Sequence, residues 1–117
     1  MSRDIKVGDY IRTSRGHIGK IKRIENDKND ESLKWYVYEE KEYDINIVKE
    51  VYINKPYIVD ASSDIRDLVR EGDYINGSRV DEVFNGIIFI EGNEYTAVKN
   101  IDTFLTKEVF DERAFYI

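Results

Sequence analysis

The chain has 117 residues, of which 41% are hydrophobic and 36% are charged, with a formal net charge of −6. This composition is too apolar for a disordered chain and indicates one globular domain or two very small ones. Cysteine is absent, which excludes disulfides, thiolate catalysis and the usual zinc sites. Because the sequence also lacks a long apolar run and a signal-peptide pattern, we expect a small cytoplasmic protein without a membrane span or a cofactor.

Charge is distributed unevenly along the chain. Residues 1–28 hold eight Lys/Arg against four Asp/Glu, residues 29–60 hold four against eight, and residues 61–117 hold six against twelve. A basic head on an acidic body suggests a charged partner, although a solvated surface that keeps the protein soluble explains it equally well.

The first half of the chain has the pattern of antiparallel strands. The motif Gly8-Asp9-Tyr10-Ile11 precedes a turn-like stretch at residues 12–16, and the polar segment 26–32 predicts a loop. Alternating apolar and polar residues predict strands over 33–38 and 45–53. In the first of these, Trp35 and Val37 lie on the expected core face. Tyr36 and Tyr38, and Tyr52 in the second strand, are expected on the opposite faces, where they either form an exposed interface or pack between two barrel units.

The second half begins with a short helix that Ser62 or Ser63 caps and Gly72 ends. Residues 80–90 predict a hairpin that turns at Asn85-Gly86, because both positions tolerate positive φ. Residues 91–94 predict a further turn before a strand over 95–98. Thr106 is expected to cap a helix over 107–112, and residues 114–117 predict a closing strand.

A near-repeat relates the two halves. Gly8-Asp9-Tyr10-Ile11 recurs 64 residues later as Gly72-Asp73-Tyr74-Ile75. A repeated motif indicates a duplicated unit, whereas the alternative is that the same residues open two unrelated strands. We therefore predict a mainly β fold of two small antiparallel SH3-like barrel units. These are an N-terminal unit over 1–60 and a C-terminal unit over 72–117, joined by a short helical linker over 61–71.

Two surfaces are candidates for binding. Carboxylates gather at an expected hairpin tip, flanked by aromatic residues that are expected to anchor a partner. This candidate partner-binding set is Tyr36, Tyr38, Glu39, Glu40, Glu42 and Asp44. Basic residues gather on the N-terminal hairpin, as on surfaces that bind phosphates, and the candidate nucleic-acid-binding set is Arg12, Arg15, Lys20, Lys22 and Arg23.

The sequence offers little for catalysis. The single histidine, His17, has no second histidine and no nucleophile motif beside it, so an exposed turn residue is the simpler interpretation. Neither a calcium loop nor a phosphate-binding loop is present. We therefore expect a protein that is not an enzyme and has no metal site.

The opening, Val7 to Thr13 followed by Gly16-x-Ile18-Gly19-Lys20-Ile21, resembles the first hairpin of SH3-like and KOW-type barrels. A longer pattern continues through Ala61-Ser62-Ser63-x-Ile65-x-Asp67-Leu68-Val69 and Gly72-Asp73-Tyr74-Ile75-Asn76-Gly77 to Leu105-Thr106-Lys107-Glu108-x-Phe110. This pattern resembles small accessory proteins of phages and prophages of low-GC Gram-positive bacteria. The resemblance implies an anti-defence role and transfers no functional site.

The function expected from these features is that of a phage-encoded binding protein. It would inhibit a host defence protein, such as a CRISPR effector in the host cytoplasm, by docking an acidic, aromatic-bearing surface. Two alternatives remain open at this stage. One is a nucleic-acid-binding adaptor that uses the basic hairpin, and the other is a sponge that sequesters a nucleotide immune signal.

Overall fold

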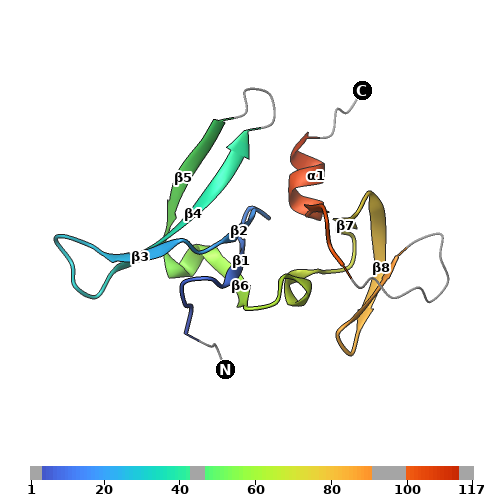
Figure 1. The fold of residues 1–117 in the computed structure, drawn as a ribbon, viewed down its shortest axis with the longest axis horizontal. Helices are drawn as coiled ribbons and strands as arrows, with labels where there is room; N and C mark the ends of the chain where they lie inside the picture. Colours follow the sequence, from blue (N-terminus) through green and yellow to red (C-terminus); the bar gives the residue numbers. More distant parts are fainter. Residues whose placement is uncertain (1–3, 43–46, 91–99, 114–117) are drawn as a thin grey trace.

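The computed structural model of the protein describes residues 4–42, 47–90 and 100–113, and their fold is mainly β. Figure 1 shows two lobes side by side, with an α-helix at the upper inner edge of the second one. The elements in chain order are β1 (Tyr10–Thr13), β2 (Ile18–Lys20), β3 (Arg23–Asn26), β4 (Lys34–Glu42), β5 (Ile47–Ile53), η1 (Lys55–Tyr57), β6 (Ile58–Ser62), η2 (Ile65–Leu68), β7 (Tyr74–Ile75), β8 (Ser78–Phe84), β9 (Ile87–Ile90), β10 (Phe104–Leu105) and α1 (Lys107–Arg113).

The first lobe contains two three-stranded antiparallel sheets, in the orders β2-β1-β6 and β3-β4-β5. The chain passes directly from β2 to β3 through Ile21 and Lys22, and the Lys22 amide donates to the Val37 carbonyl (2.8 Å). This link joins one sheet to the other. The buried side chains of Ile11, Ile21, Tyr36 and Tyr38 pack between them and form the core of the lobe.

The second lobe contains one antiparallel sheet in the order β10-β7-β8-β9. Its core consists of the buried residues Val69, Ile75, Val80 and Ile88. The predicted hairpin is confirmed, because β8 and β9 flank Asn85 and Gly86, which adopt φ values of 50° and 75°. The expected strand over 95–98 and the closing strand over 114–117 lie outside the described residues.

The two near-repeats have the same backbone hydrogen bonds. In each copy the motif glycine has a positive φ, of 93° at Gly8 and 89° at Gly72. In each copy the aspartate accepts a bond from the amide three residues earlier and returns one to that residue's carbonyl. Each copy also makes two bonds to the next strand segment, to Ile21 in the first and to Val80 in the second (2.7–2.9 Å). Residues 6–11 and 70–75 are therefore structurally equivalent.

Of the two predicted helices, the C-terminal one is an α-helix and the linker one is a 3₁₀ turn. The linker contains only the 3₁₀ turn η2, and its cap is Asp64, whose carboxylate accepts from the Arg66 amide, rather than Ser62 or Ser63. The C-terminal helix is confirmed as α1, and its predicted cap is confirmed as well, because Thr106 Oγ1 accepts from the Val109 amide (3.3 Å). Among the described residues, no helix is long and apolar enough to cross a bilayer.

Candidate binding groove

A groove of about 470 Å³ opens in the first lobe, between the turn that follows β1 and the strand β5 with η1. The turn contributes residues 13–15 and His17, and β4 contributes Tyr38 and Glu40 from one face and Trp35 from the other. The remaining wall is largely apolar or aromatic. The residues around the groove are Thr13, Ser14, Arg15, His17, Trp35, Tyr38, Glu40, Lys49, Val51, Tyr52, Ile53, Asn54 and Tyr57.

Backbone bonds fix the turn that forms one side of the groove. The Thr13 amide donates to the His17 carbonyl (2.9 Å), and the His17 amide donates to Thr13 Oγ1 (3.0 Å). The Ser14 amide donates to the Tyr57 carbonyl (2.9 Å), which ties the turn to η1. This bond joins the two sides of the groove, the turn after β1 and η1.

Tyr57 is the most exposed aromatic side chain of the groove, at 59%. It ends η1, a single 3₁₀ turn whose second residue is Pro56, the only proline of the chain. Proline fixes φ near the helical value at the start of such a turn, and the Tyr57 amide closes it by donating to the Asn54 carbonyl (3.0 Å). The turn therefore fixes the backbone of Tyr57 beside the groove and leaves its side chain exposed to solvent.

Trp35 is oriented by the loop between β3 and β4. Its indole N–H donates to Asp27 Oδ2 (2.9 Å), while Asp27 Oδ1 accepts from the amides of Asn29 and Asp30. The bond from Trp35, followed by the backbone amide bonds, lowers the pKa of Asp27 below its usual value. An ionised Asp27 is a stronger acceptor, so the indole is held by a charge-assisted hydrogen bond.

The polar side of the groove is built around Glu40. Its Oε1 accepts from the hydroxyl of Tyr38 (2.9 Å) and lies 3.4 Å from His17 Nδ1. Burial, and then the charge of Glu40, raise the pKa of the Tyr38 hydroxyl, so this group is a donor over the whole physiological range. Arg15 is exposed at the rim and makes no ion pair with any residue that the structure describes.

The expectation that Tyr36 and Tyr38 are exposed anchors is wrong. Their exposed fractions are 6% and 2%, because both pack in the core with Ile11 and Ile21. Gly19 on β2 leaves the space that the Tyr38 ring fills, and a Cβ there would collide with the ring. Val37, on the other face of β4, is buried too, since its register partners Arg23 and Tyr52 flank it. Because both faces of β4 are covered at residues 36–38, the alternation of apolar and polar residues wrongly predicted that one face is exposed there.

The acidic set is only partly gathered at one place. Glu40 lines the groove, whereas Glu39 lies on the other face of β4 and bonds to Lys22 Nζ (2.8 Å). Glu42 is paired in register with Ile47, but its side chain and the whole of Asp44 lie outside the described residues.

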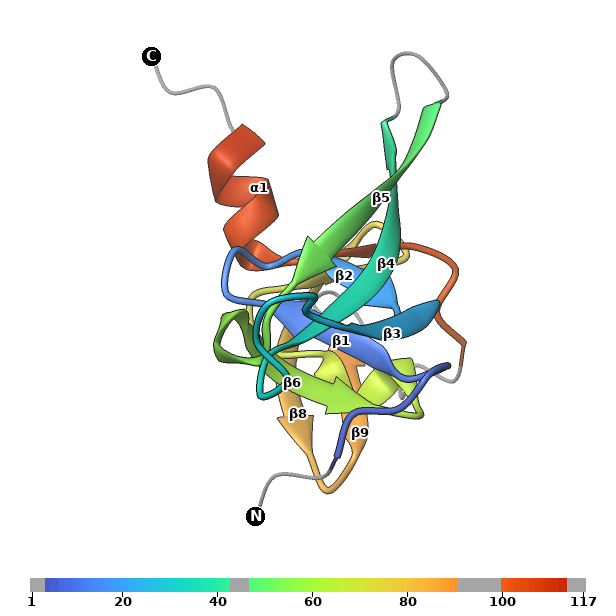
Figure 2. The same ribbon diagram turned by 90° about the vertical axis from the view of Figure 1, so that its left-hand side faces the viewer.

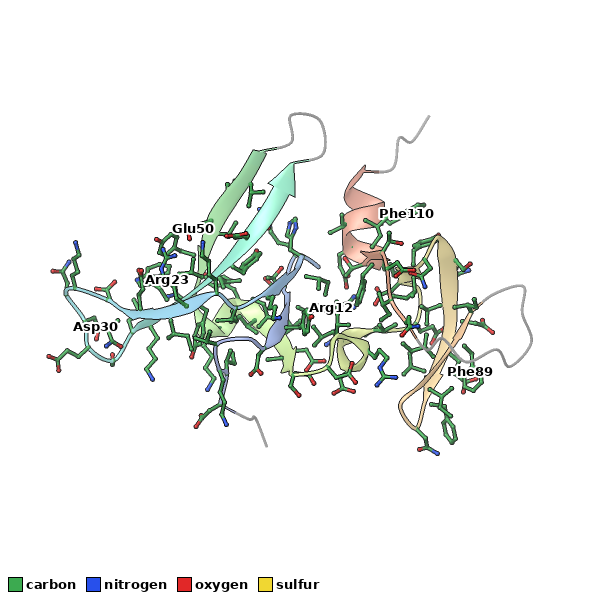
Figure 3. The ribbon with its side chains drawn as sticks, in the orientation of Figure 1. Arg12, Arg23, Asp30, Glu50, Phe89 and Phe110 are labelled. Carbon is green, nitrogen blue, oxygen red and sulfur yellow. The ribbon has the colours of Figure 1, made fainter. Side chains whose placement is uncertain are left out.

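Arg12 is not a surface cation, and its place in the nucleic-acid-binding set is wrong. Its side chain is 2% exposed and lies between the two lobes (Figure 3). Both of its terminal nitrogens donate to the Asp73 carboxylate (2.5 and 2.9 Å). In addition, Nη1 donates to the Leu68 carbonyl and Nη2 donates to Glu108 Oε2. Arg12 therefore belongs to a buried ion cluster that joins β1 to η2, β7 and α1.

Two further members of the basic set are neutralised by carboxylates. Arg23 makes a two-pronged bond to Glu50 (2.5 and 2.9 Å) and also bonds to Glu25, and Lys22 bonds to Glu39 and Glu50. Lys20 lies over the ring of Tyr10, with 5.5 Å from Nζ to the ring centroid. The N-terminal hairpin is therefore less basic in the fold than along the sequence.

Glu50 gives this pair network a pH dependence. The bonds from Arg23, and then from Lys22, lower the pKa of Glu50 from 4.5 to about 2. A carboxyl whose pKa is lower in the folded state adds stability that is present above its unfolded pKa and is lost as pH falls through the folded one. We therefore expect stability to fall between pH 4.5 and about pH 2, and to fall less in Glu50→Gln than in the wild type.

Urea titrations at a series of pH values measure this difference, at low salt because the pair is exposed. Glu31→Gln is the matched control, since Glu31 is exposed in the loop before β4. Equal acid sensitivity of Glu50→Gln and the wild type would contradict the assignment.

In the part of the chain that the structure describes, no group of three or more histidine, aspartate or glutamate side chains is arranged to hold a metal ion. Comparisons of the chain with protein-family models, curated proteins and solved structures found no match.

Sequence reasoning missed two of the aromatic residues that the structure places in the groove, Trp35 and Tyr57. Tyr57 carried a usable signal, because a proline soon after a predicted strand often forms part of a turn that presents the next side chain. Trp35 carried a misleading one, since its place in the alternation predicted a core residue. Its indole instead lies at the groove with its N–H held by Asp27.

Proposed function

We propose that this chain is a non-enzymatic binding protein that captures another protein through the groove of its first lobe. The observation that carries the proposal is the half-open groove with exposed aromatic residues, above all Tyr57. Tyrosine and tryptophan are the residues that most often dominate binding energy at protein interfaces, because they add large contact area at low entropic cost. The anchors of the proposed interface are thus Trp35, Tyr52 and Tyr57 rather than Tyr36 and Tyr38.

The two lobes are proposed to be copies of one SH3-like barrel unit. The shared hydrogen bonds of residues 6–11 and 70–75 support this, as does the equivalent sheet order. In each lobe the first strand lies between the next strand and the last one, as β2-β1-β6 and as β8-β7-β10.

The proposed partner is a host defence protein, such as a CRISPR effector, and the protein is proposed to act as a phage accessory protein in the host cytoplasm. The support is the resemblance of the opening hairpin, the second Gly-Asp-Tyr-Ile motif and the late Leu-Thr-Lys-Glu segment to small phage proteins. The net charge of −6 suits a partner with a basic nucleic-acid channel. The nucleic-acid adaptor is less well supported, because Arg12, Lys22 and Arg23 are occupied by carboxylates.

Affinity purification with two matched variants tests the proposal. The tagged full chain is incubated with lysate of a Gram-positive host after nuclease treatment, and the retained protein is then purified and titrated. Tyr57→Ser is expected to lower its affinity at least about tenfold, the size of effect that an interface anchor has. Val59→Ser is expected to leave it unchanged, since Val59 is 46% exposed but lies outside the groove.

Two outcomes would overturn the proposal. One is a chain that retains no protein from the nuclease-treated lysate, which would favour the nucleic-acid adaptor or a small ligand. The other is a partner that binds Tyr57→Ser and Val59→Ser equally well, which would move the interface away from the groove.

A further inference from the structure

Strand β5 forms one wall of the groove and is the last strand of its sheet among the described residues. Figure 2 shows β5 with β4 on one side and no other strand along its second side. No strand of the described residues therefore pairs with the backbone N–H and C=O groups on that second side. Such an open edge is the usual template for the addition of a further strand.

The groove lies along this edge rather than over one face of the sheet. Successive side chains of a strand point to opposite faces, so Val51 and Ile53 point one way and Tyr52 the other. All three nevertheless line the same groove. A hollow that reaches around the edge of a strand contacts both of its faces in this way. The backbone of residues 51–53 is thus part of the groove.

The composition of β5 suits this use at one end only. Residues 51–53 carry no charge, whereas Lys49 and Glu50 lie further along the strand. Charged side chains on an edge strand discourage pairing, and uncharged β-branched or aromatic ones favour it. The end of β5 beside Tyr57 is therefore the part of the edge that is suited to pairing.

The charge of the groove indicates the chemistry of the occupant. Arg15 is exposed at the rim and makes no ion pair with any described residue. The one carboxylate there, Glu40, already accepts a hydrogen bond from Tyr38 and faces His17. On a chain of net charge −6, this rim is a local site for an anionic group.

We propose that the occupant of the groove is an extended acidic peptide segment of the partner protein, which adds as a strand to the free edge of β5. Its backbone pairs with residues 51–53, its apolar side chains pack on Trp35, Tyr52 and Tyr57, and an acidic side chain pairs with Arg15. This inference rests on the proposed function and specifies how the partner is held.

The test starts from random peptides displayed on phage, selected on the immobilised full chain and counter-selected on the Tyr57→Ser variant. We expect selected peptides with alternating β-branched or aromatic residues and at least one Asp or Glu. Arg15→Glu is expected to weaken the best peptide at least about tenfold, as the loss of a charge-assisted contact would. Lys20→Glu, which makes the same change of charge outside the groove, is expected to leave its affinity within about twofold.

The backbone readout is specific to strand addition. In a paired strand only every second amide faces its neighbour, so N-methylation of the selected peptide should weaken binding at alternate positions and be tolerated between them. Amide hydrogen exchange of the full chain should show new protection at every second residue of β5.

Strand addition would be overturned by the selection of proline-rich peptides. It would also be overturned if the effect of N-methylation on affinity did not alternate along the peptide, or if Arg15→Glu bound the best peptide with unchanged affinity. Failure to select any peptide would overturn it as well. The affinity purification with Tyr57→Ser tests the proposed function separately. A groove that binds a folded protein surface would lose affinity in Tyr57→Ser in that experiment but would yield no strand-like peptide in this one.

Discussion

Replacement of Arg12 by methionine is expected to lower the free energy of unfolding by about 3–5 kcal/mol, the usual cost of removing one partner from a buried ion pair. The Asp73 carboxylate is fully buried, and its charge would lose both guanidinium bonds. Only the backbone amides of Arg70 and Lys107 would still donate to it. The loss is a large share of the stability of a domain of this size.

Urea unfolding measures this effect, with Arg15→Met as the control because Arg15 is exposed and its replacement should cost no more than about 0.5 kcal/mol. The double variant Arg12→Met/Asp73→Asn is expected to recover part of the loss, because the uncompensated charge is gone while an amide oxygen still accepts from the backbone. Equal stability of Arg12→Met and Arg15→Met would contradict the assigned role of the cluster.

The second large effect is expected at Gly16, where the turn after β1 meets α1. Gly16 has a φ of 83°, and its carbonyl accepts a hydrogen bond from Thr106 Oγ1 (2.5 Å). A Cβ at this position would lie 2.5 Å from Thr106 Oγ1 and 2.6 Å from Glu108 Cβ. Alanine there combines an unfavourable backbone conformation with a collision at the junction of the lobes.

Gly77 is a matched control for this substitution, since its φ is 82° and nothing lies within 4 Å of the Cβ position. Gly77→Ala is therefore expected to cost only the backbone penalty of about 1–2 kcal/mol. Gly16→Ala is expected to cost about 1–3 kcal/mol more, the usual range for overpacking a filled site. Urea unfolding of both variants isolates the contact between the turn and α1.

The same variants test whether the lobes unfold together. Each lobe has a small core, and the Arg12 cluster and the Thr106 bond join them. We expect one unfolding transition in the wild type and two in Gly16→Ala. Equal costs of the two glycine variants, or two transitions in the wild type, would show that the junction does not couple the lobes.

Features that depend on neighbouring residues were predictable from the sequence. The turn at Asn85-Gly86 needs only two residues that tolerate positive φ, and the cap at Thr106 needs only a hydroxyl three residues before an amide. The strands β4 and β5 and the loop before them were predicted for the same reason. The cap of the linker turn was predicted only approximately: it is Asp64, one or two residues after the predicted Ser62 or Ser63.

The sequence by itself thus determined a mainly β chain with two equivalent Gly-Asp-Tyr-Ile segments, because alternation, turns and caps are set within a few residues. Only the tertiary structure decided which polar and aromatic side chains are buried. Arg12 meets Asp73 across 61 residues and Gly16 meets Thr106 across 90. Tyr38 is buried by a space that Gly19 leaves on another strand. The groove depends on the same long-range packing, because its walls come from a turn, an edge strand and a 3₁₀ turn that no local pattern brings together.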